Sequence, residues 1–101
     1  MSRYTISREA RQDLKDIYRY LAESNPSAAG RLIDLFFERF RLLTSHPLLG
    51  QSRDDLARDV RIFPAGRYVV LYRPTKSGVA IAKIVHSARD LSALFARREH
   101  D

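Results

Sequence analysis

The feature of this sequence that most constrains its fold is a pair of apolar stripes separated by a short break. The first stripe recurs every three or four residues and consists of Ala10, Leu14, Ile17 and Leu21. The second has the same spacing and consists of Ala29, Ile33, Phe36, Phe40 and Leu43. Residues at these spacings lie on one face of an α-helix. Because only a short SNPS segment separates the stripes, the two helices are predicted to run antiparallel as a helical hairpin.

The ends of both predicted helices carry the expected signals. Ser7 can cap the first helix, and Glu9 lies in its first turn, where the helix dipole favours an acid. Asn25 can cap the second helix, with Pro26 at its first position. This helix should stop before His46, since the proline that follows disfavours helical geometry there.

Short β-prone runs flank the hairpin. They are residues 2–6 (SRYTI), 60–63 (VRIF), 67–73 (RYVVLYR) and 79–86 (VAIAKIVH). The turns between the last three are short, with Pro64 expected to end one run and Pro74 the next, so these runs are predicted to form an antiparallel meander.

The last run does not alternate cleanly. Val79, Ile81 and Val85 share one face with Lys83, whereas Ile84 and His86 fall on the opposite face. A β-bulge near Ala82 would reconcile the two phases. The face on which His86 points stays open at this stage.

After residue 86, Ser87 can cap a final helix with Asp90 in its first turn. Its apolar residues are Leu91, Leu94 and Phe95. The predicted fold class is therefore α+β, with an N-terminal strand, a helical hairpin packed on a small antiparallel sheet and a short C-terminal helix. With 101 residues, 45% of them hydrophobic, residues 1–101 are expected to form a single domain.

Composition narrows the class of protein. The chain has no cysteine, no apolar run near the roughly 20 residues that span a bilayer, and no apolar signal-peptide core, so a cytoplasmic protein is expected. Its net charge is +6, and 15 of its 18 cationic residues are Arg. Residues 60–98 contain eight Lys or Arg against one acid, a local charge of +7. This basic segment favours an anionic partner, although a solvated surface is the plain alternative.

One stretch, IVHSARDL (residues 84–91), suggests RNA cleavage. That reaction needs a base, an acid and cations for the developing phosphate charge, and His can serve as acid or base near neutral pH. Of the three histidines, His46 precedes a proline, His100 lies near the C-terminus, and His86 alone lies among arginines. No acid or His spacing suggests a metal site, and neither a metal nor a cofactor is expected.

Several motifs in this order resemble the RelE/ParE superfamily of bacterial toxins, and the ParE branch most. They are AxxDLxxIYxYLA (10–22), NPSAA (25–29), HPLLG (46–50), RxDL (53–56), VRIFPAGRYVVLYR (60–73) and GVAIAKIVHSARD (78–90). The resemblance implies a toxin of a type II toxin–antitoxin pair, held inactive by a cognate antitoxin in a possible hetero-oligomer. ParE-like members poison DNA gyrase, and RelE-like members cut mRNA on the ribosome.

Two departures from the RelE pattern favour the gyrase target. The segment before residue 60, RDDLARD, is acid-rich where RelE-like nucleases are basic, and no tyrosine follows Tyr72. We therefore expect inhibition by binding, with no catalytic residue. The expected target-binding residues are Arg61, Arg67, Arg73, His86 and Arg89.

Three alternatives remain open. In a nuclease, His86, Arg61 and Arg89 would carry the reaction. The chain could also be a non-toxic relic that only binds an antitoxin. Structurally, His86 could simply pack at a strand end, and Arg89 could be a helix-surface residue.

Overall fold

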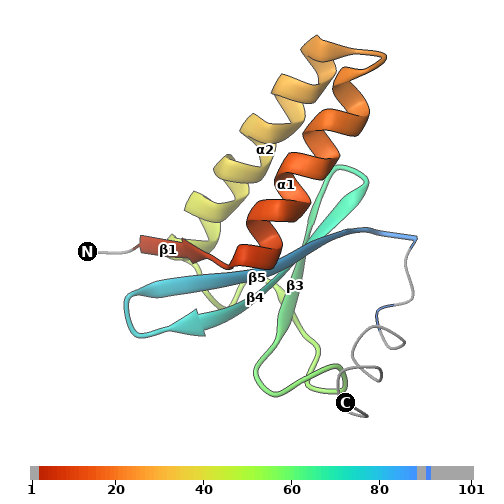
Figure 1. Cartoon of the computed structure of the whole chain (residues 1–101). Coiled ribbons are helices and arrows are strands. Elements are labelled where there is room, and N and C mark those ends of the chain that lie inside the picture. The colour runs from red at the N-terminus through yellow and green to blue at the C-terminus, as the bar shows by residue number, and fades with distance from the viewer. Residues whose placement is uncertain (1–2, 89–90, 92–101) are drawn as a thin grey trace.

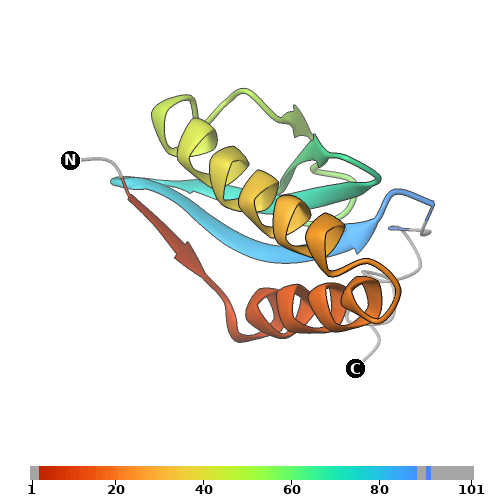
Figure 2. The ribbon, with the colours of Figure 1, turned by 90° about the horizontal axis from the view of Figure 1, so that it is seen from above.

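The computed structural model describes residues 3–88 and 91 and has the α+β architecture predicted (Figure 1). Its elements are β1 (Arg3–Ile6), α1 (Arg8–Ala22), α2 (Pro26–Ser45), β2 (Gln51–Ser52), β3 (Arg61–Ala65), β4 (Tyr68–Thr75) and β5 (Gly78–His86). The two helices lie side by side over one face of the sheet (Figure 2). The connection from β2 to β3 lies below the sheet, away from the helices (Figure 1). Apart from its cap Ser87, Ala88 and Leu91, the predicted final helix lies outside the described residues.

Both helix caps are confirmed. The Ser7 hydroxyl accepts a hydrogen bond from the Ala10 N–H at 3.0 Å, and the Asn25 side chain accepts one from the Ala28 N–H at 3.1 Å. Each bond satisfies an N–H group that has no partner within its own helix. The second helix ends at Ser45, immediately before His46, as predicted.

The sheet is mixed: the predicted antiparallel meander of β3, β4 and β5 is confirmed, and the N-terminal strand, whose pairing the sequence did not predict, joins it at one edge. The strand order is β1-β5-β4-β3-β2, and β1 runs parallel to β5, with Arg3 opposite Gly78. A parallel pair needs a long crossover, and the whole intervening chain, helical hairpin included, supplies it. The remaining neighbours are antiparallel, and the two-residue strand β2 was not predicted.

The strands also extend beyond the two prolines that were expected to end them. Pro64 lies within β3 and Pro74 within β4. The pairing of β2 with β3 involves only residues 61 and 62, and that of β3 with β4 reaches only Tyr72. Each proline therefore lies where one side of its strand has no partner, a position that tolerates a missing N–H.

The predicted β-bulge is present at Ala82. Leu71 of β4 pairs with Lys83, but the next residue, Tyr72, pairs with Ile81, so Ala82 is the extra residue. The Ser7 hydroxyl donates to the Ala82 carbonyl at 2.7 Å. As a result Ile81 and Ile84 both join the core beneath the helices, which strict alternation would not allow.

Two sets of buried side chains stabilise the domain. The main core lies between the helices and the sheet and consists of Ala10, Leu14, Phe36, Phe40, Leu43, Ala65, Val70, Tyr72, Val79, Ile81 and Ile84. Outside this cluster the buried hydrophobic residues are Ala29, Leu56, Val60, Leu71 and Val85. Because Leu56 and Val60 come from the acid-rich connection, their burial anchors this connection to the domain.

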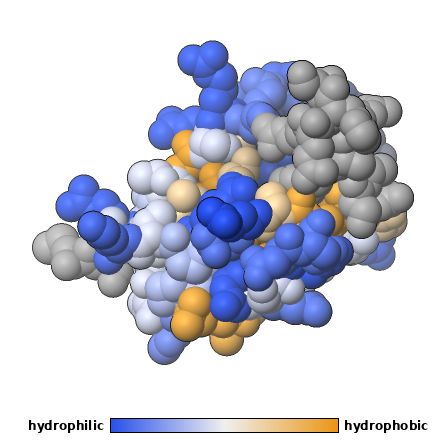
Figure 3. Space-filling view, turned by 90° about the horizontal axis from the view of Figure 1, so that it is seen from below, coloured by the Kyte–Doolittle hydropathy of each residue, from blue (hydrophilic) through white to orange (hydrophobic). Residues whose placement is uncertain are grey.

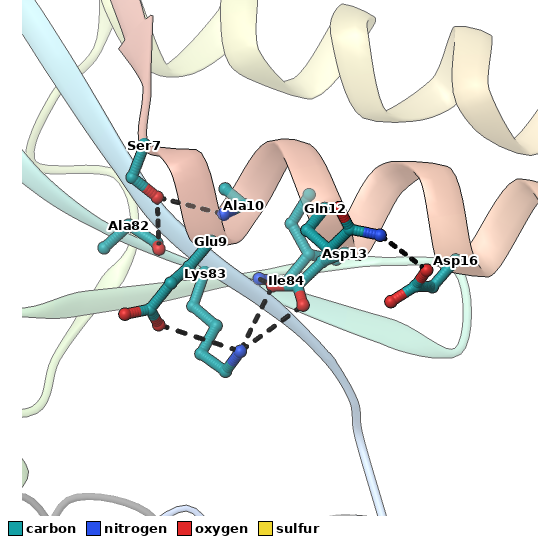
Figure 4. A network of polar contacts seen from close by, with 9 residues as sticks. All are labelled: Ser7, Glu9, Ala10, Gln12, Asp13, Asp16, Ala82, Lys83 and Ile84. Carbon is teal, nitrogen blue, oxygen red and sulfur yellow. Dashed lines mark hydrogen bonds and ion pairs between the residues drawn. The ribbon is translucent and has the colours of Figure 1, made fainter.

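Beyond Ile81, side chains of α1 take the place of a neighbouring strand for β5 (Figure 4). The Asp13 carboxylate accepts a hydrogen bond from the Ile84 N–H at 2.9 Å. Lys83 Nζ lies 3.3 Å from the same carboxylate and 3.9 Å from Glu9. These contacts satisfy polar groups of β5 where β1 has already ended.

Candidate partner-binding surfaces

His86 lies at the end of β5 and pairs with Tyr68 of β4. The two rings meet edge to face with centroids 5.4 Å apart, and Tyr68 meets Phe36 of α2 in the same way at 5.7 Å. His86 therefore points to the helix side of the sheet, which answers the question the sequence left open. Its Nδ1 accepts a hydrogen bond from the Ala88 N–H at 3.1 Å, although the side chain is exposed.

The predicted arginines do not gather at one place. Arg61 pairs with Tyr72, and its Nη1 donates to the carbonyls of Gly50 at 2.7 Å and Leu48 at 3.2 Å. Arg73 donates from Nε to the Arg58 carbonyl at 3.0 Å.

Arg67 lies at the opposite end of β4, near His86. It is exposed, and its carbonyl accepts a hydrogen bond from the Ser87 N–H at 2.9 Å. The structure thus brings Arg67 and His86 together and separates them from Arg61 and Arg73. Arg89 lies outside the described residues.

A polar arrangement that the sequence did not reveal holds the loop after α2. The Tyr72 ring is fully buried, and its hydroxyl donates to the Pro47 carbonyl and accepts from the Gly50 N–H, each at 2.8 Å. Burial raises the pKa of Tyr72 above its ordinary value, and the hydrogen bond at Gly50 and the nearby Arg61 partly oppose this. Periodicity placed Tyr72 on a sheet face, but nothing local in the sequence identified partners more than twenty residues away.

A second feature that sequence reasoning missed is an apolar groove at the junction of α1, α2 and β1. Its volume is about 620 Å³, and it is lined by Tyr4, Ile6, Arg11, Leu14, Lys15, Tyr18, Ile33 and Phe37. Arg11 and Lys15 are exposed, so two cations border an otherwise apolar surface. The face below the sheet is different, because most of its visible surface is hydrophilic and its apolar areas are small and separate (Figure 3).

Among residues 3–88 and 91, no group of three His, Asp or Glu side chains could hold a metal ion. Within the same residues, neither helix combines the length and the apolar character that crossing a membrane requires.

The fold matches that of a solved structure from a bacterial ParDE system. A solved structure titled "Chromosomal ParDE TA system from P. aeruginosa" matches with a TM-score of 0.72, covering 85% of this chain and 96% of that one at 20% sequence identity.

The family follows from sequence. The family model for the ParE toxin of the type II toxin–antitoxin system parDE matches residues 4–91. The chain belongs to this family, within the RelE/ParE superfamily.

Relatives in Caulobacter vibrioides carry both branch names. Toxin RelE3 is 38% identical over 88 residues, which cover 86% of this chain and 96% of the relative. Toxin ParE3 is 28% identical over 99 residues, covering 97% and 99% respectively. The protein is thus a type II toxin by family, and the two names do not assign its target.

Proposed function

We propose that this toxin inhibits DNA gyrase by binding it in the cytoplasm, and that a cognate antitoxin neutralises it. The ParE family match and the resemblance to the ParE branch support gyrase as the proposed target. The observation that supports inhibition by binding rather than by cleavage is the separation of His86 from Arg61. His86 pairs with Tyr68 and Arg61 pairs with Tyr72, and these two tyrosines are four residues apart on β4. At ~3.3 Å per residue this is about 13 Å along the strand.

A nuclease would need these groups to converge on one phosphate. A general acid or base must lie within hydrogen-bond reach of the proton it transfers, and the cations must face the same developing charge. Instead, the Arg61 guanidinium donates to two loop carbonyls, and the His86 ring packs against Tyr68. This arrangement supports a binding role for both residues.

The antitoxin is proposed to place an apolar segment with acidic flanks in the groove bordered by Arg11 and Lys15. The groove is open and mainly apolar, which suits an amphipathic segment that folds on binding. Carboxylates of that segment would lie opposite the two cations and speed association.

The experiment that tests this proposal compares the two targets in parallel. Purified toxin is added to gyrase in a supercoiling assay, and to ribosomes programmed with mRNA. We expect loss of supercoiling or trapped cleaved DNA, intact mRNA, and relief by antitoxin. In cells, expression without antitoxin should stop DNA replication and produce filaments.

The second candidate is a ribosome-dependent mRNA endonuclease. It is favoured by the name of one relative, Toxin RelE3, which is 38% identical. Cleavage of mRNA in the ribosomal A site, abolished in His86→Ala, would replace the gyrase proposal with this one. A protein that binds antitoxin but never arrests growth would instead be a non-toxic relic.

A further inference from the structure

We propose that the loop carrying Leu48 and Leu49, with the acidic hollow beside it, docks onto the target protein of this toxin. The matching surface on the target would combine an apolar recess with a Lys or Arg side chain. This inference rests on the proposed function in that it requires a protein target, but it does not depend on that target being gyrase.

The loop is held in one conformation by hydrogen bonds to its backbone. The Tyr72 hydroxyl contacts both ends, at Pro47 and Gly50, and Arg61 contacts the carbonyls of Leu48 and Gly50. The Leu49 N–H donates to the His46 carbonyl at 3.0 Å.

Gly50 is required by this close packing. A Cβ at this position would lie 2.5 Å from the Tyr72 hydroxyl and 2.7 Å from the Ile62 carbonyl oxygen. Any side chain would therefore push the loop away from the tyrosine that holds it.

A loop fixed so firmly nevertheless presents two large apolar side chains to solvent. Leu48 is 69% exposed and Leu49 48% exposed. Neither contributes to the core, so their burial on folding does not explain why the loop is held. A surface ordered in advance loses little conformational entropy on binding, and apolar anchors of this kind carry much of the affinity of protein interfaces.

The hollow next to Leu48 indicates the charge of the partner. Its volume is about 210 Å³, and it is lined by Leu48, Ser52, Asp54, Asp59, Arg61 and Pro74. Its lining thus has two carboxylates against one guanidinium, which already donates to loop carbonyls. Arg73, next to Pro74, does not line the hollow and donates to the Arg58 carbonyl. The third acid of the connection is Asp55, which Arg53 binds through two hydrogen bonds of 2.9 Å.

The hollow therefore suits a cation from a partner and disfavours a nucleic-acid phosphate or an acidic antitoxin segment. The groove on the helical hairpin has the opposite charge, with Arg11 and Lys15 at its border. Two surfaces of opposite charge fit two different partners. The antitoxin segment proposed above matches the groove, and we assign the Leu48–Leu49 loop to the target.

The test uses the full chain, with growth arrest in cells lacking antitoxin as its first readout. We expect the double variant Leu48→Ser, Leu49→Ser to need about tenfold more toxin for the same arrest, the loss typical of removing interface anchors. Its melting temperature and antitoxin affinity should match the parent, because both side chains are exposed. Tyr20→Ser removes a similarly exposed apolar side chain from α1 and is the matched control.

Charge is tested separately with Asp59→Asn and Asp54→Asn, against Asp34→Asn on α2 as the control. Asn tolerates the positive φ of Asp59, 62°, and an amide oxygen at residue 54 can still accept the Asp59 N–H. We expect Asp59→Asn and Asp54→Asn each to weaken growth arrest by a few-fold. Each should also bind purified target more weakly than the parent, and this binding should depend less on salt concentration.

Each outcome decides the proposal. The proposal is overturned if the double leucine variant keeps full toxicity or loses antitoxin binding. It is also overturned if the parent is a dimer that these substitutions dissociate. If the double leucine variant arrests growth less strongly but the parent toxin does not bind gyrase, the gyrase target is overturned and the role of the loop is supported. A parent that never arrests growth overturns both.

Discussion

At the scale of single residues, Tyr72 connects the sheet to the loop that follows α2. Its ring fills the core, and its hydroxyl binds the buried Gly50 N–H and the partly buried Pro47 carbonyl. A phenylalanine would fill the same space but leave both groups unsatisfied, at a cost of about 1–3 kcal/mol. Arg61 would then be the remaining side chain that binds this loop, at the carbonyls of Leu48 and Gly50.

This gives a prediction about pH. Because burial raises the pKa of Tyr72, the folded state retains the hydroxyl proton at a pH where the unfolded chain releases it. The corresponding stability is complete below the ordinary tyrosine pKa of about 10 and is lost as pH rises through the folded value. We expect the free energy of unfolding in urea to fall more steeply above pH 10 in the parent than in Tyr72→Phe. Equal slopes would contradict this.

Gly78 is the second residue whose substitution has a sharp consequence. It has a φ of 154°, and a Cβ there would overlap the carbonyl oxygen of Arg3 on β1. We expect Gly78→Ala to destabilise the fold by more than about 3 kcal/mol, because β1 must move away from β5. Gly30→Ala is the control, since nothing lies within 4 Å of its added Cβ, and it should stabilise α2 by about 0.5–1 kcal/mol. Urea unfolding measures both.

At the scale of elements, the sequence predicted what local rules determine. Both helices and their caps could be read because apolar period, cap residue and proline agreed within a few positions. The bulge at Ala82 could be read because one strand contained two conflicting phases. Neither the parallel pairing of β1 with β5 nor the existence of β2 could be predicted. Each depends on partners distant in sequence, and these strands are too short to carry a pattern.

The contact between α1 and β5 gives the prediction at this scale. Asp13→Ala removes the acceptor of the Ile84 N–H and the nearest partner of Lys83, whose side chain is 23% exposed. We expect a loss of about 1–3 kcal/mol in the free energy of unfolding. Asp16→Ala also places Ala in α1, but its ion pair with Arg19 is exposed and 3.8 Å long, so its effect should be within about 0.5 kcal/mol. Equal effects would argue against the role of Asp13.

Across the whole molecule, the sequence gives the number of charged residues but not their positions relative to one another. The basic segment suggested one arginine surface, yet the strands carry Arg61 and Arg67 to opposite ends of the sheet, and backbone carbonyls engage Arg61 and Arg73. The groove could not be predicted from sequence, because its lining residues come from three separate elements. The position of side chains relative to one another is a property of the assembled sheet.

The groove leads to the prediction at this scale. Lys15→Glu should slow association with the antitoxin several-fold at low salt, and the difference should shrink as salt rises. Lys76→Glu makes the same change in net charge at an exposed turn residue that does not line the groove, and it is the control. Stopped-flow association rates at several salt concentrations measure both. If the two variants slow association equally, net charge rather than the groove governs the encounter.

The parallel pairing of the first and last described strands has a consequence for the order of folding. Ser7 and the Ala82 carbonyl that it binds are 75 residues apart, so this edge of the sheet closes only after a large loss of chain entropy. The helical hairpin involves short-range contacts and can form much earlier. Tyr4 and Ile6 of β1 complete the groove, and they reach it only when β5 is in place. An antitoxin that recognises the whole groove would therefore bind fully folded toxin and would not bind nascent or truncated chains.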